Sequence, residues 1–380
     1  MRILITNNTL AGRAGTELYV RDLAISLQNR GHTPIAYSSK LGDVAGELRK
    51  ATIPVVDDLR ALPFRPDIIH GQHHLDTMTA MLSLPGVPAI SFCHGWIPWE
   101  EMPPVFPRIL RYVAVDATCL DRVLYEARIP EEKVKVMLNF VDLKRFQRRA
   151  PLPAKPGRAV IFSNYARGDN YVQSVREACA RSQIELDVIG SGIETATNEP
   201  EVILPGYDLV FAKGRSALEA MAVGNALIVC DASGCGPLVS TQNFDKLRQL
   251  NFGIRTLRDA FTVERLMEQI AQYNAEESGK VCELVRHQAD LEQTTDALVQ
   301  MYEEVIAEFK QSSQADLATE LAAAGAYMQS LSPLVKKVIN TAPLPPLPPA
   351  PIPIPVPAPT PPKKKRSLPS RVLRAIRNRD

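Results

Sequence analysis

Short apolar runs alternate with amphipathic segments over about the first 150 residues. Residues 2–6 and 33–37 are apolar runs of strand length, and between them apolar side chains recur at helical spacing through residues 16–30. Gly31 follows this helix as its expected C-terminal cap. Strands separated by helices predict a parallel sheet with helices on both faces. Further strands are predicted at residues 68–70, 89–93 and 112–115.

A second unit with the same alternation begins near Gly157, after a proline-containing linker over residues 150–157. Residues 276–339 have an almost wholly helical pattern. We therefore expect an α/β protein with two Rossmann-like, doubly wound domains that face a cleft. The expected boundaries are 1–150, 151–310 and a helical extension over 311–341. The predicted elements of the second unit are strands at 159–163, 185–189, 202–204 and 227–231 and helices at 171–182 and 263–274.

The last segment, residues 342–380, has a different composition. Residues 342–362 are rich in proline, which predicts an extended polyproline spacer. The basic run Lys363–Arg366 follows, and then Val372, Leu373 and Ile376 lie among arginines. This pattern is typical of a basic amphipathic helix that binds an anionic membrane surface or a protein partner. A solvated tail without a partner is the alternative.

Charge and cysteine content exclude several classes of protein. The chain has 44 Lys and Arg against 42 Asp and Glu in 380 residues, which argues against nucleic acid as a partner. No apolar run approaches the ~18 residues of a membrane-spanning helix. The six cysteines have no metal-ligand spacing, so we expect reduced thiols in a cytoplasmic protein. We expect no metal and no cofactor.

The most informative segment contains Lys213, Gly214, Arg215, Ser216 and Glu219. The four residues 213–216 follow a short apolar run, and a helix is predicted to open at Ser216 with Glu219 in its first turn. The glycine, the free N–H groups at the helix start and the two basic side chains together favour an anion. A carboxylate one turn later suits the two hydroxyls of a ribose. Ser216 and Glu219 also match a capping box, which would explain Glu219 without any ligand.

Three segments resemble those of GT-B glycosyltransferases, in particular the retaining nucleotide-sugar enzymes of family 4 (glycosyltransferase group 1). Residues 12–17 resemble the first glycine loop and helix start of that family, and residues 136–146 are similar to its I-x-N-G-V-D-x-x-x-F segment. Residues 218–224 match its donor-site helix. The resemblance implies transfer of a hexosyl group from a nucleotide sugar, the substrate, to a glycan, lipid-linked or other acceptor. It also implies a metal-independent site and retention of configuration.

The resemblance also implies roles for single residues. The backbone at Gly15 and Thr16 would approach the donor diphosphate or sugar, and Glu219 would bind the ribose. His94, at a strand end, would lie near the donor sugar as the catalytic residue, while His70 and His73 would lie on the acceptor side. Arg167 would contact the phosphates. The predicted donor site is completed by Lys213, Gly214, Arg215 and Ser216.

The sequence departs from the family at the donor loop. Phe211 stands where the family has a first glutamate, eight residues before Glu219, and residues 212–216 replace its Glu-Gly-Phe-Gly loop. This shorter form also resembles the second domain of MurG-type transferases and sugar-nucleotide epimerases. An epimerase-like enzyme and a non-catalytic GT-B scaffold that acts through its tail are therefore the alternatives. For a transferase we expect a role in polysaccharide or envelope assembly, in the cytoplasm and peripherally at the inner face of the membrane.

Overall fold

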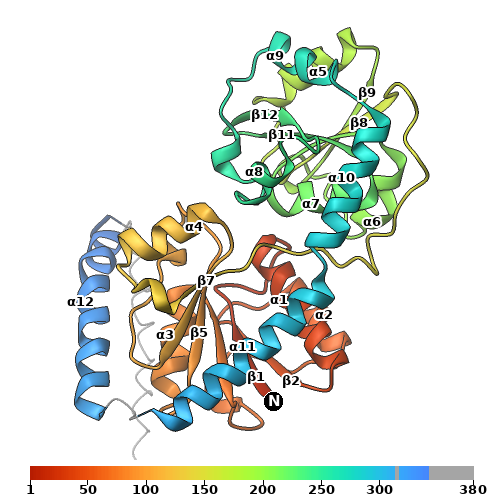
Figure 1. Cartoon of the computed structure of the whole chain (residues 1–380). Helices are drawn as coiled ribbons and strands as arrows, with labels where there is room; N and C mark the ends of the chain where they lie inside the picture. The colour runs from red at the N-terminus through yellow and green to blue at the C-terminus, as the bar shows by residue number, and fades with distance from the viewer. Residues whose placement is uncertain (313–315, 342–380) are drawn as a thin grey trace, which may run out of the picture. The chain divides into compact units, whose positions relative to one another are not determined.

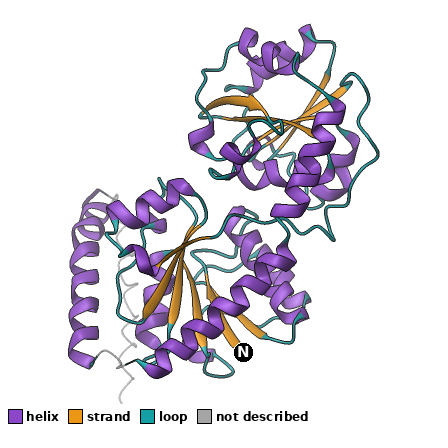
Figure 2. Cartoon of the chain, in the orientation of Figure 1, coloured by secondary structure: helices purple, strands orange, loops and turns teal. Residues whose placement is uncertain are grey.

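Two β-sheets organise the described residues, 1–312 and 316–341, of the computed structural model (Figures 1 and 2). The first sheet has seven parallel strands in the order β3-β2-β1-β4-β5-β6-β7. Its order reverses between β1 and β4, where an open α/β sheet places its crevice. The strands are β1 (Arg2–Thr6), β2 (Thr33–Tyr37), β3 (Val55–Val56), β4 (Ile68–Gln72), β5 (Ala89–Cys93), β6 (Ile109–Ala114) and β7 (Val134–Val136).

The second sheet has five strands in the order β12-β11-β10-β8-β9. Four of them are parallel, and the edge strand β12 pairs antiparallel with β11. The order reverses between β8 and β10, which gives this sheet a crevice of its own. The strands are β8 (Arg158–Phe162), β9 (Glu185–Ile189), β10 (Leu209–Ala212), β11 (Ala226–Asp231) and β12 (Gly234–Leu238).

Helices pack on both faces of each sheet (Figure 2). The expected helix over residues 16–30 is α1, and its periodic side chains Val20, Leu23 and Leu27 are fully buried. The two sheets and helices α1 to α11 belong to one unit, residues 1–330, and α12 continues past the end of that unit. The helices are α1 (Gly15–Asn29), α2 (Asp43–Lys50), α3 (His74–Ser83), α4 (Ala117–Asp121), α5 (Val172–Arg181), α6 (Pro200–Ile203), α7 (Gly214–Val223), α8 (Phe244–Arg248), α9 (Val263–Ile270), α10 (Ala275–Gln288), α11 (Leu291–Gln311) and α12 (Leu317–Thr341).

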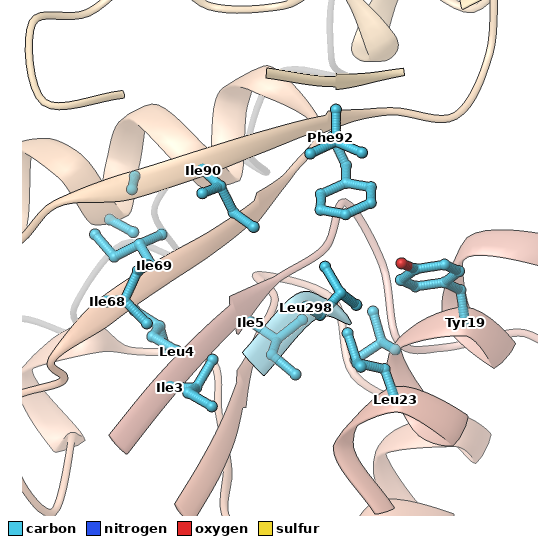
Figure 3. Close-up of a cluster of buried hydrophobic side chains, with 14 of the residues drawn as sticks. Ile3, Leu4, Ile5, Tyr19, Leu23, Ile68, Ile69, Ile90, Phe92 and Leu298 are labelled. Carbon is cyan, nitrogen blue, oxygen red and sulfur yellow. The ribbon is translucent and has the colours of Figure 1, made fainter. Parts of the chain in front are cut away.

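Helix α11 returns to the first sheet, although the expected boundary 151–310 places it in the second domain. Its Leu298 is fully buried in the same core as Ile5 and Leu23 (Figure 3). The hydroxyl of Tyr302, also in α11, is 2.6 Å from His70 Nδ1. The first domain is therefore completed by a segment distant in sequence, which periodicity alone does not reveal.

The strand expected at residues 202–204 is wrong. The chain there forms α6, followed by a 3-10 turn over Leu204–Gly206. Pro200 and Pro205 lack the N–H group that a strand ladder needs, and both fit the first turn of a helix. No helix among the described residues is both long and apolar enough to cross a membrane. The predicted basic segment at 363–380 and its proline-rich spacer lie outside the described residues.

Candidate functional site

A cavity of about 450 Å³ lies at the carboxyl ends of strands from both sheets. Its walls include the loop 12–14 and the first residues of α1, the residues that follow β8 and β9, and the first turns of α7. Both crevices expected from the strand orders therefore contribute to one cavity. Its volume is within the range of about 300–1,000 Å³ that is usual for small-molecule sites.

Two helices begin at this cavity. Helix α1 begins at Gly15 after Ala14, and α7 begins at Gly214 after Lys213. Neither capping residue hydrogen-bonds the helix through its side chain. The first N–H groups of each helix lack intrahelical acceptors, and each helix dipole is positive at this end. The cavity is thus suited to an anion that contacts both domains.

Helix α7 begins two residues earlier than expected. Ser216 is therefore its third residue and Glu219 lies in its second turn, so the capping box does not form. Gly214 has φ +59°, a conformation that favours glycine, and its N–H donates to the Phe252 carbonyl at 2.9 Å. The cap that could have explained Glu219 without a ligand is excluded.

Arg215 joins the two domains through buried carboxylates. Its Nε donates to Glu219 Oε1 at 2.8 Å, and its Nη2 pairs with Asp22 of α1. The side chain of Arg215 is 13 % exposed and those of Asp22 and Glu219 are 4 % and 6 % exposed. The sequence places Arg215 beside the phosphates, but the structure places its charge between two carboxylates.

Burial and ion pairing have opposing effects on the pKa values of Asp22, Glu219 and Arg215. Burial raises the pKa of Asp22, but the guanidinium groups of Arg215 and Arg21 outweigh it and the pKa is lowered. Burial raises the pKa of Glu219 above its usual value, and the charge of Arg215 opposes this rise. Burial lowers the pKa of Arg215, but Asp22 and Glu219 reverse the effect, so its net shift is upward. Arg215 therefore favours the ionised form of both carboxylates.

A second cavity, of about 400 Å³, is lined by Lys213 and His94. Lys213 is paired with the buried Asp231, and its Nζ lies 4.8 Å from the centre of the Tyr165 ring. Because Lys213 lines this cavity and Arg215 lines the first, the two cavities flank the start of α7. Lys213 and Arg215 are only two positions apart in the segment 213–216 but line different cavities.

His94 presents a neutral imidazole to the second cavity. Burial lowers the pKa of His94 to about 4, and its Nε2 has no hydrogen-bond partner among the described residues. Its backbone N–H donates to Glu101 Oε2 at 2.8 Å. The other oxygen of Glu101 lies 3.2 Å from His73 Nε2, and His73 Nδ1 accepts the Asn8 N–H at 3.0 Å. Both nitrogens of His73 are occupied, so His94 is the free imidazole of this group.

The predicted site residues do not all line one cavity. Those in the first cavity are Gly15, Arg215, Ser216 and Glu219, and those in the second are His94 and Lys213. Gly214 begins the helix between them. Thr16 and Arg167 line neither cavity: Thr16 Oγ1 donates to Glu17 Oε2 at 3.0 Å, and Arg167 lies exposed. His70 is part of the core, stacked on Phe92 at 4.3 Å, and the expected place on the acceptor side is wrong.

Sequence reasoning missed several residues that line the first cavity. One of them has no signal in the sequence, and others could have been found because they directly follow a predicted strand. Arg145 lines the cavity and pairs with Glu201 at 2.6 Å. It lies in the segment 136–146, but at a position that the family's motif leaves unspecified. Asn164 and Gly190 each follow a predicted strand, where ligands gather, and that position is their signal. A Cβ at Gly190 would lie 1.9 Å from the Ser163 carbonyl oxygen, so only glycine allows these two loops to meet.

Residues 13–145 match the sequence profile of Glycosyltransferase Family 4. The structure is similar to a glycosyltransferase from Rickettsia africae (TM-score 0.59, 15 % identity, 82 % of this chain and 99 % of that one). It is also similar to Anabaena HepE, solved with UDP and glucose (TM-score 0.56, 14 % identity, 80 % of this chain and 100 % of that one). A third similar structure is sucrose-phosphate synthase of Thermosynechococcus elongatus (TM-score 0.53, 12 % identity, 80 % of this chain and 99 % of that one). At such identities these likenesses show the fold, which is GT-B as expected. No curated protein sequence matches the chain.

Proposed function

We propose that this chain, a glycosyltransferase of the GT-B fold with a family 4 N-terminal domain, transfers a sugar from a nucleoside diphosphate to an acceptor hydroxyl. One observation carries the proposal: the N-termini of α1 and α7, from different domains, meet at one cavity that also contains the carboxylate Glu219. A nucleotide sugar needs a site for an anion beside a site for ribose hydroxyls, and this cavity offers both.

We assign the diphosphate to the amides at Gly15, Arg215 and Ser216, and the ribose to Glu219. The sugar would extend past the start of α7 into the second cavity, toward His94 and Lys213. In this arrangement preorganised amides and helix dipoles stabilise the charge on the departing diphosphate, which is the main requirement for breaking its bond to the sugar. These groups need no metal, and His94 contributes a neutral hydrogen bond to the sugar.

We further propose retention of configuration, with the acceptor hydroxyl attacking from the face that the diphosphate leaves. No enzyme nucleophile is then needed. The acceptor is a glycan or a lipid-linked sugar, and the basic segment after residue 362 would bring the enzyme to an anionic membrane.

A thermal-shift screen tests the donor site. The full chain is heated with UDP, GDP, ADP and their sugars, with and without Mg²⁺; UDP is the first probe because HepE was solved with it. We expect one nucleotide to raise the melting temperature equally in both conditions, because a ligand at 100 times its Kd stabilises by about 2.7 kcal/mol. A rise that requires Mg²⁺ would contradict metal independence, and no rise with any nucleotide would contradict the donor site.

One observation favours a second candidate, a GT-B protein that binds without transfer. Phe211, at the position of the family's first glutamate, is fully buried in β10 and pairs in register with Ile161 and Ile228. No carboxylate can face the donor from this position. Release of nucleoside diphosphate from a bound nucleotide sugar in the presence of acceptor sugars separates the two candidates. Binding without release over a broad set of acceptors would favour the scaffold.

A further inference from the structure

The carboxylate of Glu219 is held on one side only. Its Oε1 accepts from Arg215 Nε, while no described residue donates to Oε2. Glu219 lines the first cavity, and its side chain is 6 % exposed. A buried carboxylate with one satisfied and one unsatisfied oxygen has a hydrogen-bonding deficit that a ligand hydroxyl can fill.

The guanidinium that holds Glu219 is itself fixed from the opposite domain. Arg215 Nη2 pairs with Asp22 of α1, and Asp22 Oδ1 also accepts from Arg21 Nε at 2.7 Å. A planar guanidinium that bridges two carboxylates has little freedom to rotate. If Arg215 moved to a phosphate, it would leave Glu219 buried without the guanidinium that pairs with it and Asp22 with Arg21 alone, which is strongly unfavourable.

We propose that Arg215 is the positioning residue for ribose recognition. It holds Oε1 of Glu219 and leaves Oε2 for the ribose hydroxyls, while Asp22 anchors the guanidinium from the first domain. This assignment rests on the proposed nucleotide site and adds to it a side chain that acts on the ribose only through Glu219. It also makes ribose recognition depend on contact between the two domains.

The test compares nucleotides with and without ribose hydroxyls. Isothermal titration of the full chain with UDP, GDP and ADP, and with their 2′,3′-dideoxy forms, gives a Kd ratio that reports the hydroxyl contacts alone. We expect a ratio of about 10 to 100 in the wild type, the range for hydrogen bonds to a charged group. In Arg215→Met the ratio should fall below about 3, while affinity for the dideoxy form changes little.

Arg255→Met is the matched control. Arg255 of the second domain also pairs with an aspartate of the first, Asp121 Oδ2 at 2.5 Å, but lines neither cavity. The ratio of Kd values for the dideoxy and the ordinary nucleotide in Arg255→Met should equal that of the wild type. If Arg215→Met fails to fold, Arg215→Lys takes its place, because a single ammonium cannot reproduce the bridging fork and should lower the ratio at least threefold.

The outcomes separate the two proposals. A wild-type ratio retained in the folded Arg215 variant would overturn the positioning role and leave the nucleotide site intact. An equal loss in Arg255→Met would attribute the effect to domain contact in general and would also overturn it. If no nucleotide binds the wild type, the proposed function fails, and this inference fails with it.

Discussion

The sequence allows two roles for Glu219, and the structure excludes one of them. Its position in residues 218–224 indicates ribose binding, while its spacing from Ser216 fits a cap. The structure excludes the cap because α7 begins at Gly214. It gives the carboxylate a cation at i−4 instead, and a place in the wall of a cavity.

Replacement of Glu219 by Gln tests its role directly. Gln keeps the size of the side chain and one acceptor oxygen but removes the charge. We expect Kd for the bound nucleotide to rise about 10- to 100-fold, because a hydrogen bond to a charged group contributes about 1.5–3 kcal/mol. Titration calorimetry measures the change. An unchanged affinity in a folded variant would leave Glu219 only as the partner of Arg215.

The ion pairs of Arg215 and Arg255 should differ in their effect on stability. Arg215→Met leaves Glu219 buried without the guanidinium that pairs with it and leaves Asp22 with Arg21 alone. We expect the free energy of unfolding to fall by about 3–5 kcal/mol. Arg255 and Asp121 are 33 % and 43 % exposed, so Arg255→Met should cost no more than about 1 kcal/mol. Urea unfolding of both variants measures the difference. Similar losses would mean that Arg215 is not the dominant link between the domains.

Among the elements, the loops after β8 and β9 set the shape of the first cavity. They meet at Gly190, where there is no room for a Cβ beside Ser163. Phe211 shows the opposite case on β10: its large side chain fills the core and cannot take part in a site. The short donor loop therefore begins only after Ala212, at Lys213.

Gly190→Ala tests this loop contact. We expect a loss of about 1–3 kcal/mol in stability, because the added methyl must displace backbone atoms, and a weaker affinity for nucleotide. Gly168→Ala is the control, because a Cβ there meets nothing within 4 Å. Melting temperature and titration with UDP report both effects. A Gly190 variant as stable as the Gly168 variant would contradict the close approach of the two loops.

At the scale of the whole molecule, helix α12 and the basic end of the chain follow the two domains in sequence. Helix α12 has a row of exposed apolar side chains, Leu317, Leu321, Met328 and Val335, along one face. Its Tyr327 hydroxyl is 2.7 Å from His74 Nδ1, so this helix also contacts the first domain. The proline-rich segment and the basic end follow it in sequence.

Removal of residues 342–380 tests the proposed membrane contact. We expect the full chain to sediment with vesicles that contain anionic lipid and the truncated chain to stay in solution, because each basic residue near such a surface contributes about 1 kcal/mol. The melting temperature should not change. A variant with Lys363–Arg366 replaced by Gln is the charge control, and equal sedimentation of the full and truncated chains would remove the membrane role.

The sequence by itself determined the local elements and two of the segments that line the first cavity. The alternation of apolar runs and amphipathic helices predicted both sheets, since strand and helix formation depend on near neighbours. The glycine loop at Gly15 and the helix that contains Glu219 were placed at strand ends, and the structure brings both to one cavity.

Only the tertiary structure decided which side chains meet. Asp22 and Arg215 are 193 positions apart, and α11 packs on a sheet whose strands end long before it begins. Such contacts depend on the position of whole elements in space, which no local pattern encodes. For the same reason, Lys213 and Arg215, only two positions apart, have different partners and line different cavities.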